Sequence, residues 1–69
     1  ITKGVEAAVF LYPIEDGYKV SMRSNEYVNV AEIAKLYGGG GHIRAAGCSV
    51  KGTLEEVKDT ILKEITKQL

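Results

Sequence analysis

The sequence has no excess of charge of either sign and almost no cysteine. Nine Lys and Arg residues balance nine Asp and Glu residues, so the 69-residue chain lacks the broad positive field that attracts duplex nucleic acid without specificity. The single cysteine, Cys48, excludes an internal disulfide and a multi-cysteine zinc site, and it is compatible with a reducing cytoplasm. Because the charges balance, any anion binding must depend on a local group of residues. Cys48 is expected to be a buried, inert thiol, and the expected location is cytoplasmic.

Long apolar runs are also missing. No stretch approaches the roughly 20 apolar residues that a membrane helix needs, and no signal-peptide pattern opens the chain. The apolar fraction of 45% and the charged fraction of 26% are those of an ordinary soluble domain with one small core. Because the chain begins with Ile1 rather than Met, we expect it to be a piece of a longer protein. Because it has no long apolar run, we expect no membrane partner.

What is present begins with two alternating runs. Apolar residues recur at every second position from Val5 to Leu11, and a second alternating run extends from Tyr18 to Ser24. Between them, Pro13 fixes its own φ, and the Asp-Gly pair that ends at Gly17 suits positive φ. These features predict a β-hairpin.

Capping residues indicate two helices. Asn29 and Glu32 form a capping-box pattern before a short helical repeat of apolar residues, which Gly38 ends. Thr53 and Glu56 form a second capping box. It precedes an apolar stripe spaced by three and four residues, made of Leu54, Val57, Ile61, Ile65 and Leu69.

A short apolar stretch from Ala46 to Lys51, between the two helices, predicts a third strand. The order ββαβα then predicts an α+β fold, with a small sheet of at least three strands and two helices packed against it.

The segment GGGGHIRAAG, residues 38–47, is the most informative part of the chain. Four consecutive glycines cost about 1 kcal/mol each on ordering relative to Ala, so a fold that keeps them is expected to need close approach or positive φ there. Glycine-rich turns can point successive N–H groups into one concavity that holds phosphate oxygens, and His42 could donate to the same anion. If residues 42–46 form one helical turn, its free N–H groups would add to that site. The alternative is a helix cap at Gly38 followed by a flexible connection, with His42 an incidental surface side chain.

The second predicted strand ends at Arg23 and Ser24. A guanidinium at a strand edge can bind a phosphate through two parallel hydrogen bonds, although an isolated Arg is more often only solvated. Strand alternation places Arg23 and Ser24 on opposite faces unless the strand bulges or ends between them. We therefore predict that Arg23 contacts a ligand while Ser24 braces the glycine loop.

Three segments together resemble a known family. Ser21-Met22-Arg23-Ser24, Val30-Ala31-Glu32-Ile33-Ala34 and the segment 38–47 are similar to successive signatures of the DHH-associated C-terminal domain. This domain occurs in nano-RNases, phosphoadenosine phosphate phosphatases, cyclic-di-AMP phosphodiesterases and relatives of RecJ. The resemblance covers nearly the whole chain, and it implies that residues 1–69 form the substrate-binding domain of a larger phosphoesterase.

The resemblance also implies a division of labour. A separate N-terminal DHH domain in cis, with a manganese pair, would make the parent protein a phosphodiesterase or oligoribonuclease, while this domain holds a nucleotide or a short single-stranded oligonucleotide by its phosphates. The family's metal ligands do not map onto this chain, so we expect no catalytic residue, metal or cofactor here and an inactive isolated fragment. The implied phosphate contacts are Arg23, Ser24, Gly39, Gly40, Gly41 and His42, with Arg44 and Tyr27 as further candidates.

Other functions stay open. Polyphosphate or a cyclic dinucleotide would suit the same groups, because a nest of amides and an Arg recognise phosphate rather than base. A noncatalytic interaction or dimerisation module is a second alternative, because a small core invites burial against another surface, and the parent protein could form a homodimer. The related C-terminal module of alanyl-tRNA synthetases is disfavoured by the neutral charge balance.

Overall fold

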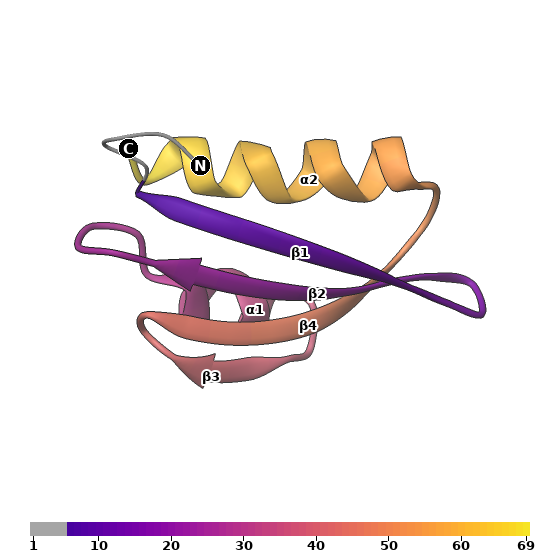
Figure 1. The fold of residues 1–69 in the computed structure, drawn as a ribbon, viewed down its shortest axis with the longest axis horizontal. Coiled ribbons are helices and arrows are strands. Elements are labelled where there is room, and N and C mark those ends of the chain that lie inside the picture. Colours follow the sequence, from indigo (N-terminus) through magenta and orange to yellow (C-terminus); the bar gives the residue numbers. More distant parts are fainter. Residues whose placement is uncertain (1–5) are drawn as a thin grey trace.

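Two β-hairpins form one antiparallel sheet in the computed structural model, which describes residues 6–69 (Figure 1). The first hairpin consists of β1 (Ala7–Ile14) and β2 (Gly17–Ser24), and the second of β3 (Gly40–His42) and β4 (Ala45–Lys51). The strands lie in the order β1-β2-β4-β3. The α+β fold class is therefore confirmed. The predicted third strand is β4, and β3 is an additional strand, so the element order is ββαββα. Val5 lies outside the described residues.

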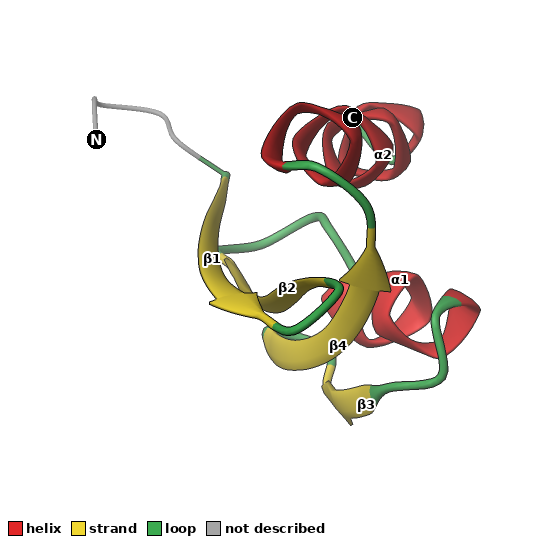
Figure 2. Cartoon of the chain, turned by 90° about the vertical axis from the view of Figure 1, so that its right-hand side faces the viewer, coloured by secondary structure: helices red, strands yellow, loops and turns green. Residues whose placement is uncertain are grey.

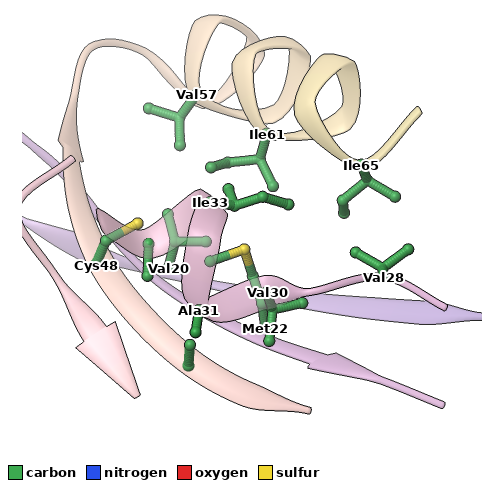
Figure 3. Close-up of a cluster of buried hydrophobic side chains, with 12 residues drawn as sticks. Val20, Met22, Val28, Val30, Ala31, Ile33, Cys48, Val57, Ile61 and Ile65 are labelled. Atoms are coloured by element: carbon green, nitrogen blue, oxygen red, sulfur yellow. The ribbon is translucent and has the colours of Figure 1, made fainter. Parts of the chain in front are cut away.

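Both helices cover the same face of the sheet (Figure 2). Helix α1 (Val30–Leu36) contacts β3 and β4, and α2 (Leu54–Lys67) contacts β2. Val20 and Met22 of β2 meet the helices in one core, together with Cys48 of β4 (Figure 3). Cys48 is buried as predicted, and its loss of solvation raises the pKa of the thiol. The core side chains are Val20, Met22, Val28, Val30, Ala31, Ile33, Ala34, Ala46, Cys48, Val57, Ile61 and Ile65.

The start of α1 is capped partly by the far end of the chain. Asn29 Oδ1 accepts a hydrogen bond from the Glu32 N–H at 3.1 Å, as the capping-box pattern predicts. The return bond from the Glu32 side chain is replaced: the Asn29 N–H donates to Gln68 Oε1 at 2.7 Å, and Gln68 Nε2 donates to the Asn29 carbonyl at 3.2 Å. The cap therefore also fixes the end of α2 beside the start of α1.

The end of α1 confirms the predicted role of Gly38. Its φ of 78° is the left-handed conformation that glycine adopts without strain. The Gly38 N–H donates to the Lys35 carbonyl at 3.2 Å, and the Gly39 N–H donates to the Ala34 carbonyl at 2.8 Å. This pair of bonds is a Schellman motif, which turns the chain out of α1 and into β3.

Helix α2 has the complete capping box predicted for it. The Glu56 N–H donates to Thr53 Oγ1 at 3.2 Å, and the Thr53 N–H donates to Glu56 Oε1 at 2.9 Å. The predicted apolar stripe is correct at its centre, where Val57, Ile61 and Ile65 are buried, and wrong at its ends, because Leu54 and Leu69 are exposed. Within the described residues, neither helix is long and apolar enough to cross a membrane.

The first hairpin turns at Glu15 and Asp16, and Pro13 lies inside β1. A proline is tolerated there because β1 is an edge strand. The expected positive φ is wrong, because Gly17 does not have one. Glycine is needed for close approach instead, since a Cβ at Gly17 would overlap the Val50 carbonyl oxygen on β4.

The helical turn predicted at residues 42–46 is wrong. Ile43 and Arg44 instead form a two-residue turn that joins β3 to β4. Neither residue has the positive φ that the usual two-residue hairpin turns require. The turn is held from outside. The Val30 N–H donates to the Ile43 carbonyl, and the Ser24 N–H donates to the Arg44 carbonyl, both at 3.0 Å. Tertiary hydrogen bonds therefore replace local turn chemistry here.

The Glu6 carboxylate holds the loop between β2 and α1. It accepts hydrogen bonds from the N–H groups of Glu26, Tyr27 and Val28, the last two at 2.7 and 2.8 Å. Partial desolvation alone would raise the pKa of Glu6, but the backbone donors at Val28, Glu26, Tyr27 and Asn25 outweigh it and hold the pKa below its ordinary value of 4.5. The charged form of Glu6 is thus the form that fits this loop.

Acidification should remove the stabilisation that Glu6 provides. Because its folded-state pKa is depressed, this contribution is present above about pH 4.5 and is lost as the pH falls through the folded pKa. Glu6→Gln should therefore be less stable than the wild type at neutral pH, and the gap should shrink below pH 4.5. Urea unfolding followed by circular dichroism between pH 7 and pH 2.5 measures this, and a gap that stays constant over the whole range would contradict it.

Candidate functional site

Three neighbouring cross-strand rows lie on the face of the sheet opposite the helices, next to a fourth, Ile14-Gly17-Lys51, at the end with the β1-β2 turn. Directly opposed residues of antiparallel strands share a face, and so do residues two apart along one strand. Arg23, Lys19 and His42 are exposed, whereas Val20 and Met22, which alternate with them on β2, are buried against the helices. The rows are Ala8-Arg23-Ala45-His42, Phe10-Ser21-Gly47-Gly40 and Tyr12-Lys19-Ser49.

A hollow of about 310 Å³ lies on this open face. Arg23 lines it from β2, and Gly40 and Gly41 line it from β3. The antiparallel β2-β4-β3 arrangement brings these residues together although 17 positions separate Arg23 from Gly40 in the sequence (40 − 23). Ser21, Ala45 and Gly47 also line the hollow, and so does Lys19, which lies four residues before Arg23 on β2. The structure thus places Arg23, Gly40 and Gly41 around one hollow, and their contact with a ligand stays a prediction.

His42 lies in the same row as Arg23. Both are paired with Ala45, one from each side, so their Cα atoms are two strand spacings apart, about 10 Å. The small side chain of Ala45 leaves the space between them open. His42 is exposed at the end of β3 and is not part of the lining of the hollow.

Different structural requirements explain the glycines at positions 38, 39 and 41. Gly38 needs its positive φ for the helix cap. A Cβ at Gly39 would overlap the Gly47 carbonyl oxygen, and at Gly41, whose φ is 145°, it would lie 2.6 Å from the Ala46 Cα atom. Gly40 has neither reason: its φ is not positive, and a Cβ there would meet no atom within 4 Å. The fold therefore does not explain Gly40, which borders the hollow.

The glycine run does not form the predicted nest of converging amides. Gly40, Gly41 and His42 are a β-strand, in which successive N–H groups point to opposite edges. What β3 offers instead is bare backbone on the open face, together with the outer edge of the last strand of the described sheet. A ligand can therefore approach the main chain closely at Gly40 without meeting a side chain.

Ser24 and Arg44 do not line the hollow and instead contact the loop before α1. Ser24 Oγ donates to the Val28 carbonyl at 2.6 Å and lies 3.4 Å from the Ile43 carbonyl, so it contacts the β3-β4 turn, while the predicted bracing of the glycine loop itself stays a prediction. The Arg44 guanidinium donates to the carbonyls of Val28 and Glu26. Direct phosphate contacts from Ser24 and Arg44 stay predictions, and the structure gives both side chains backbone partners in the loop before α1.

The two tyrosines near the motif in sequence lie in different surroundings. Tyr37 packs against the core beside α1, as predicted. Tyr27 is 73% exposed on the loop that Glu6 holds, and it does not line the hollow. Its stacking role stays a prediction.

Sequence reasoning assigned no ligand contact to Lys19, Ser21 and Gly47, which also line the hollow. The alternation of β2 already places Lys19 and Ser21 on the same face as Arg23. Gly47 could be assigned only once the pairing of β2 with β4 was known, because it lies opposite Ser21.

A larger apolar groove of about 440 Å³ lies elsewhere, between β1 and α2. It contains none of the predicted phosphate contacts and carries one Lys and one Glu, so its lining suits an apolar surface rather than a phosphate. This is the surface that the alternative of an interaction module would use. Its lining residues are Glu6, Ala7, Val9, Leu11, Lys58, Ile61, Leu62, Ile65 and Leu69.

The described residues do not fit a metal pair. Among residues 6–69, no three His, Cys, Asp or Glu side chains gather as a set of ligands. A dinuclear site needs several such donors.

Comparison with known proteins gives a consistent result. The family described as DHHA1 domain matches residues 2–69. A "Bifunctional oligoribonuclease and PAP phosphatase NrnA" from Thermus thermophilus is 40% identical over 68 residues, which are 97% of this chain and 21% of that protein. A protein of the same name from Mycoplasma pneumoniae is 39% identical over 64 residues, 88% of this chain and 19% of that protein. "Oligoribonuclease NrnB" from Bacillus subtilis is 48% identical over 40 residues, 56% of this chain and 10% of that protein. The chain thus spans about a fifth of the length of the first two relatives.

Proposed function

Because this chain belongs to the DHHA1 domain family, we propose that it is the substrate-binding domain of a DHH phosphoesterase and holds a phosphate of a nucleotide or short single-stranded oligonucleotide between Arg23 and Gly40. One observation carries the proposal: Arg23 and Gly40 line the same hollow on the open face of the sheet. The names of the relatives, which describe oligoribonucleases and PAP phosphatases, support this class of substrate.

Each group in the hollow has a separate task in this proposal. The planar guanidinium of Arg23 donates two parallel hydrogen bonds to phosphate oxygens. Gly40 lets the phosphate reach the main chain, because no Cβ stands in its way. His42 donates from the rim. Ser24, through the Ile43 carbonyl, and Arg44, which donates to the Val28 carbonyl, hold the β3-β4 turn against the loop before α1.

The chemistry itself belongs to another part of the parent protein in this proposal. A DHH domain in cis would hold a manganese pair, which would supply the Lewis acidity that hydrolysis of a phosphoester needs. This chain fixes the scissile phosphate in position and compensates its charge, which lowers the entropic cost of the reaction. The chain on its own is therefore proposed to bind substrate without hydrolysing it. The proposed location is the cytoplasm, because the buried free thiol of Cys48 suits a reducing compartment.

An amide chemical-shift titration of the chain tests the binding role. We expect a 5′-phosphorylated dinucleotide and a 3′,5′-bisphosphonucleoside to give saturable shifts at the amides of Gly40, Gly41 and His42. The expected dissociation constants are roughly tens of micromolar to millimolar. No shift at these amides up to millimolar ligand, or shifts confined to the groove between β1 and α2, would contradict the proposal.

A further inference from the structure

Two aromatic side chains of β1 remain exposed on the same face as Arg23. Phe10 is 46% exposed and Tyr12 is 53% exposed. The register pairs Phe10 with Ser21 and Tyr12 with Lys19, and both partners share the open face with Arg23. Single exposed aromatics are common, but two on adjacent rows of one face form a continuous surface about 7 Å long. The core does not use either ring, so packing does not account for them.

A row of small residues connects Phe10 to the phosphate hollow. Across the sheet, Phe10 lies opposite Ser21, Ser21 opposite Gly47, and Gly47 opposite Gly40. Three strand spacings separate Phe10 from Gly40, about 14–15 Å. Between the ring and β3, only the hydroxymethyl group of Ser21 and a hydrogen of Gly47 project from this row. The row from Phe10 to Gly40, called the trough, therefore carries no large side chain between the ring and the hollow.

The charge of the open face suits a polyanion. Lys19 and Arg23 stand on either side of Ser21 on β2, so one cation flanks the trough on each side. None of the residues that form the three cross-strand rows of the described sheet is acidic. The chain is neutral as a whole, yet this face is locally positive. Aromatic platforms combined with cations are the usual means by which proteins bind single-stranded nucleic acid.

We propose that Phe10 and Tyr12 stack on the bases of a single-stranded oligonucleotide of two or more nucleotides, while Lys19 neutralises a phosphate beyond the one held at Arg23 and Gly40. This proposal rests on the proposed function of the hollow and names its substrate class. A bisphosphonucleoside has one base, and inorganic polyphosphate has none, so neither ligand can use both rings. Only an oligonucleotide engages the hollow, the trough and the platform together.

Binding measurements on single-ring variants test the platform. Phe10→Leu and Tyr12→Leu keep apolar side chains on β1 but remove the rings. Each is expected to weaken binding of 5′-phosphorylated tetraadenylate roughly 5- to 100-fold. Binding of 3′,5′-bisphosphoadenosine should change by less than about threefold in at least one of the two variants, and binding of tripolyphosphate should change by less than about twofold in both. Leu62→Ala, which alters an exposed apolar residue of α2, is the control and should leave all three affinities unchanged.

Phe10 also gives a direct signal, because it is the only phenylalanine of the chain. Its ring proton resonances should shift upfield when tetraadenylate is added and stay in place with tripolyphosphate. Unchanged tetraadenylate affinity in both Leu variants, or an equal loss for all three ligands, would overturn the platform. The hollow has a separate readout: if Arg23→Ala leaves tripolyphosphate binding unchanged while the Leu variants still lose tetraadenylate, the proposed phosphate site fails and the stacking surface stands.

Discussion

Replacing Arg23 by Ala should weaken binding of a 5′-phosphorylated dinucleotide by about 10- to 100-fold. Hydrogen bonds from a charged group contribute about 1.5–3 kcal/mol, and Arg23 lines the hollow opposite Ala45, two residues from Ser21 and four from Lys19 along β2. Arg23→Lys should fall between the wild type and Arg23→Ala, because an ammonium keeps the charge but loses the planar fork. Isothermal titration calorimetry of the three proteins measures the effect.

Lys63→Ala is the matched control for this loss of charge. Lys63 lies on α2, on the opposite side of the sheet from the hollow, and it is exposed. Its removal should leave the affinity within about twofold of the wild type. Because Arg23 is exposed and makes no described ion pair, Arg23→Ala should also keep the wild-type melting temperature. Equal affinities of Arg23→Ala and Lys63→Ala would reduce Arg23 to an ordinary surface residue.

The second large effect is a contrast between two neighbouring glycines. Gly39→Ala should destabilise the fold by about 1–3 kcal/mol, because the new methyl group would overlap the Gly47 carbonyl oxygen and lie 2.7 Å from Cys48 Cβ. Gly40→Ala should leave stability unchanged or raise it by up to about 1 kcal/mol, since the methyl group meets no atom and the unfolded chain loses freedom. Urea unfolding of both variants measures the difference.

The binding of the same two variants separates structure from function. Gly40→Ala should weaken dinucleotide binding at least about fivefold while it stays fully folded, because its methyl group projects where the phosphate is proposed to approach the main chain. A stable Gly40→Ala protein with wild-type affinity would show that the glycine has no part in binding. Gly47 is less informative, because a Cβ there would already lie 3.1 Å from the Val20 carbonyl oxygen.

Most of the fold could be predicted because its signals are local. The alternation of β1 and β2, the caps at Asn29 and Thr53 and the stop at Gly38 each depend on residues within a few positions of one another. The β3-β4 hairpin escaped prediction for the opposite reason. Ile43 and Arg44 carry no turn signal, and the bonds that hold them come from Val30 and Ser24, which are distant in sequence. Tertiary contacts decided that segment.

The site was predictable to a similar extent. Strand alternation predicted that Arg23 and Ser24 lie on opposite faces of the sheet, and the register of β2 agrees. The resemblance to a family singled out the glycine run, but neither source could show that β4 lies between β2 and β3. That strand order brings Arg23, Gly40 and Phe10 onto one face of the sheet. The distinction between Gly39 and Gly40 likewise depends on neighbours that only the folded chain supplies.

A crystal structure of the chain with 5′-phosphorylated diadenylate tests the central claim most directly. The account predicts phosphate oxygens within hydrogen-bonding distance of the Arg23 guanidinium and against the backbone of Gly40, in the hollow on the open face. A dinucleotide bound in the groove between β1 and α2, or a phosphate at Tyr27 with the hollow left to solvent, would contradict it.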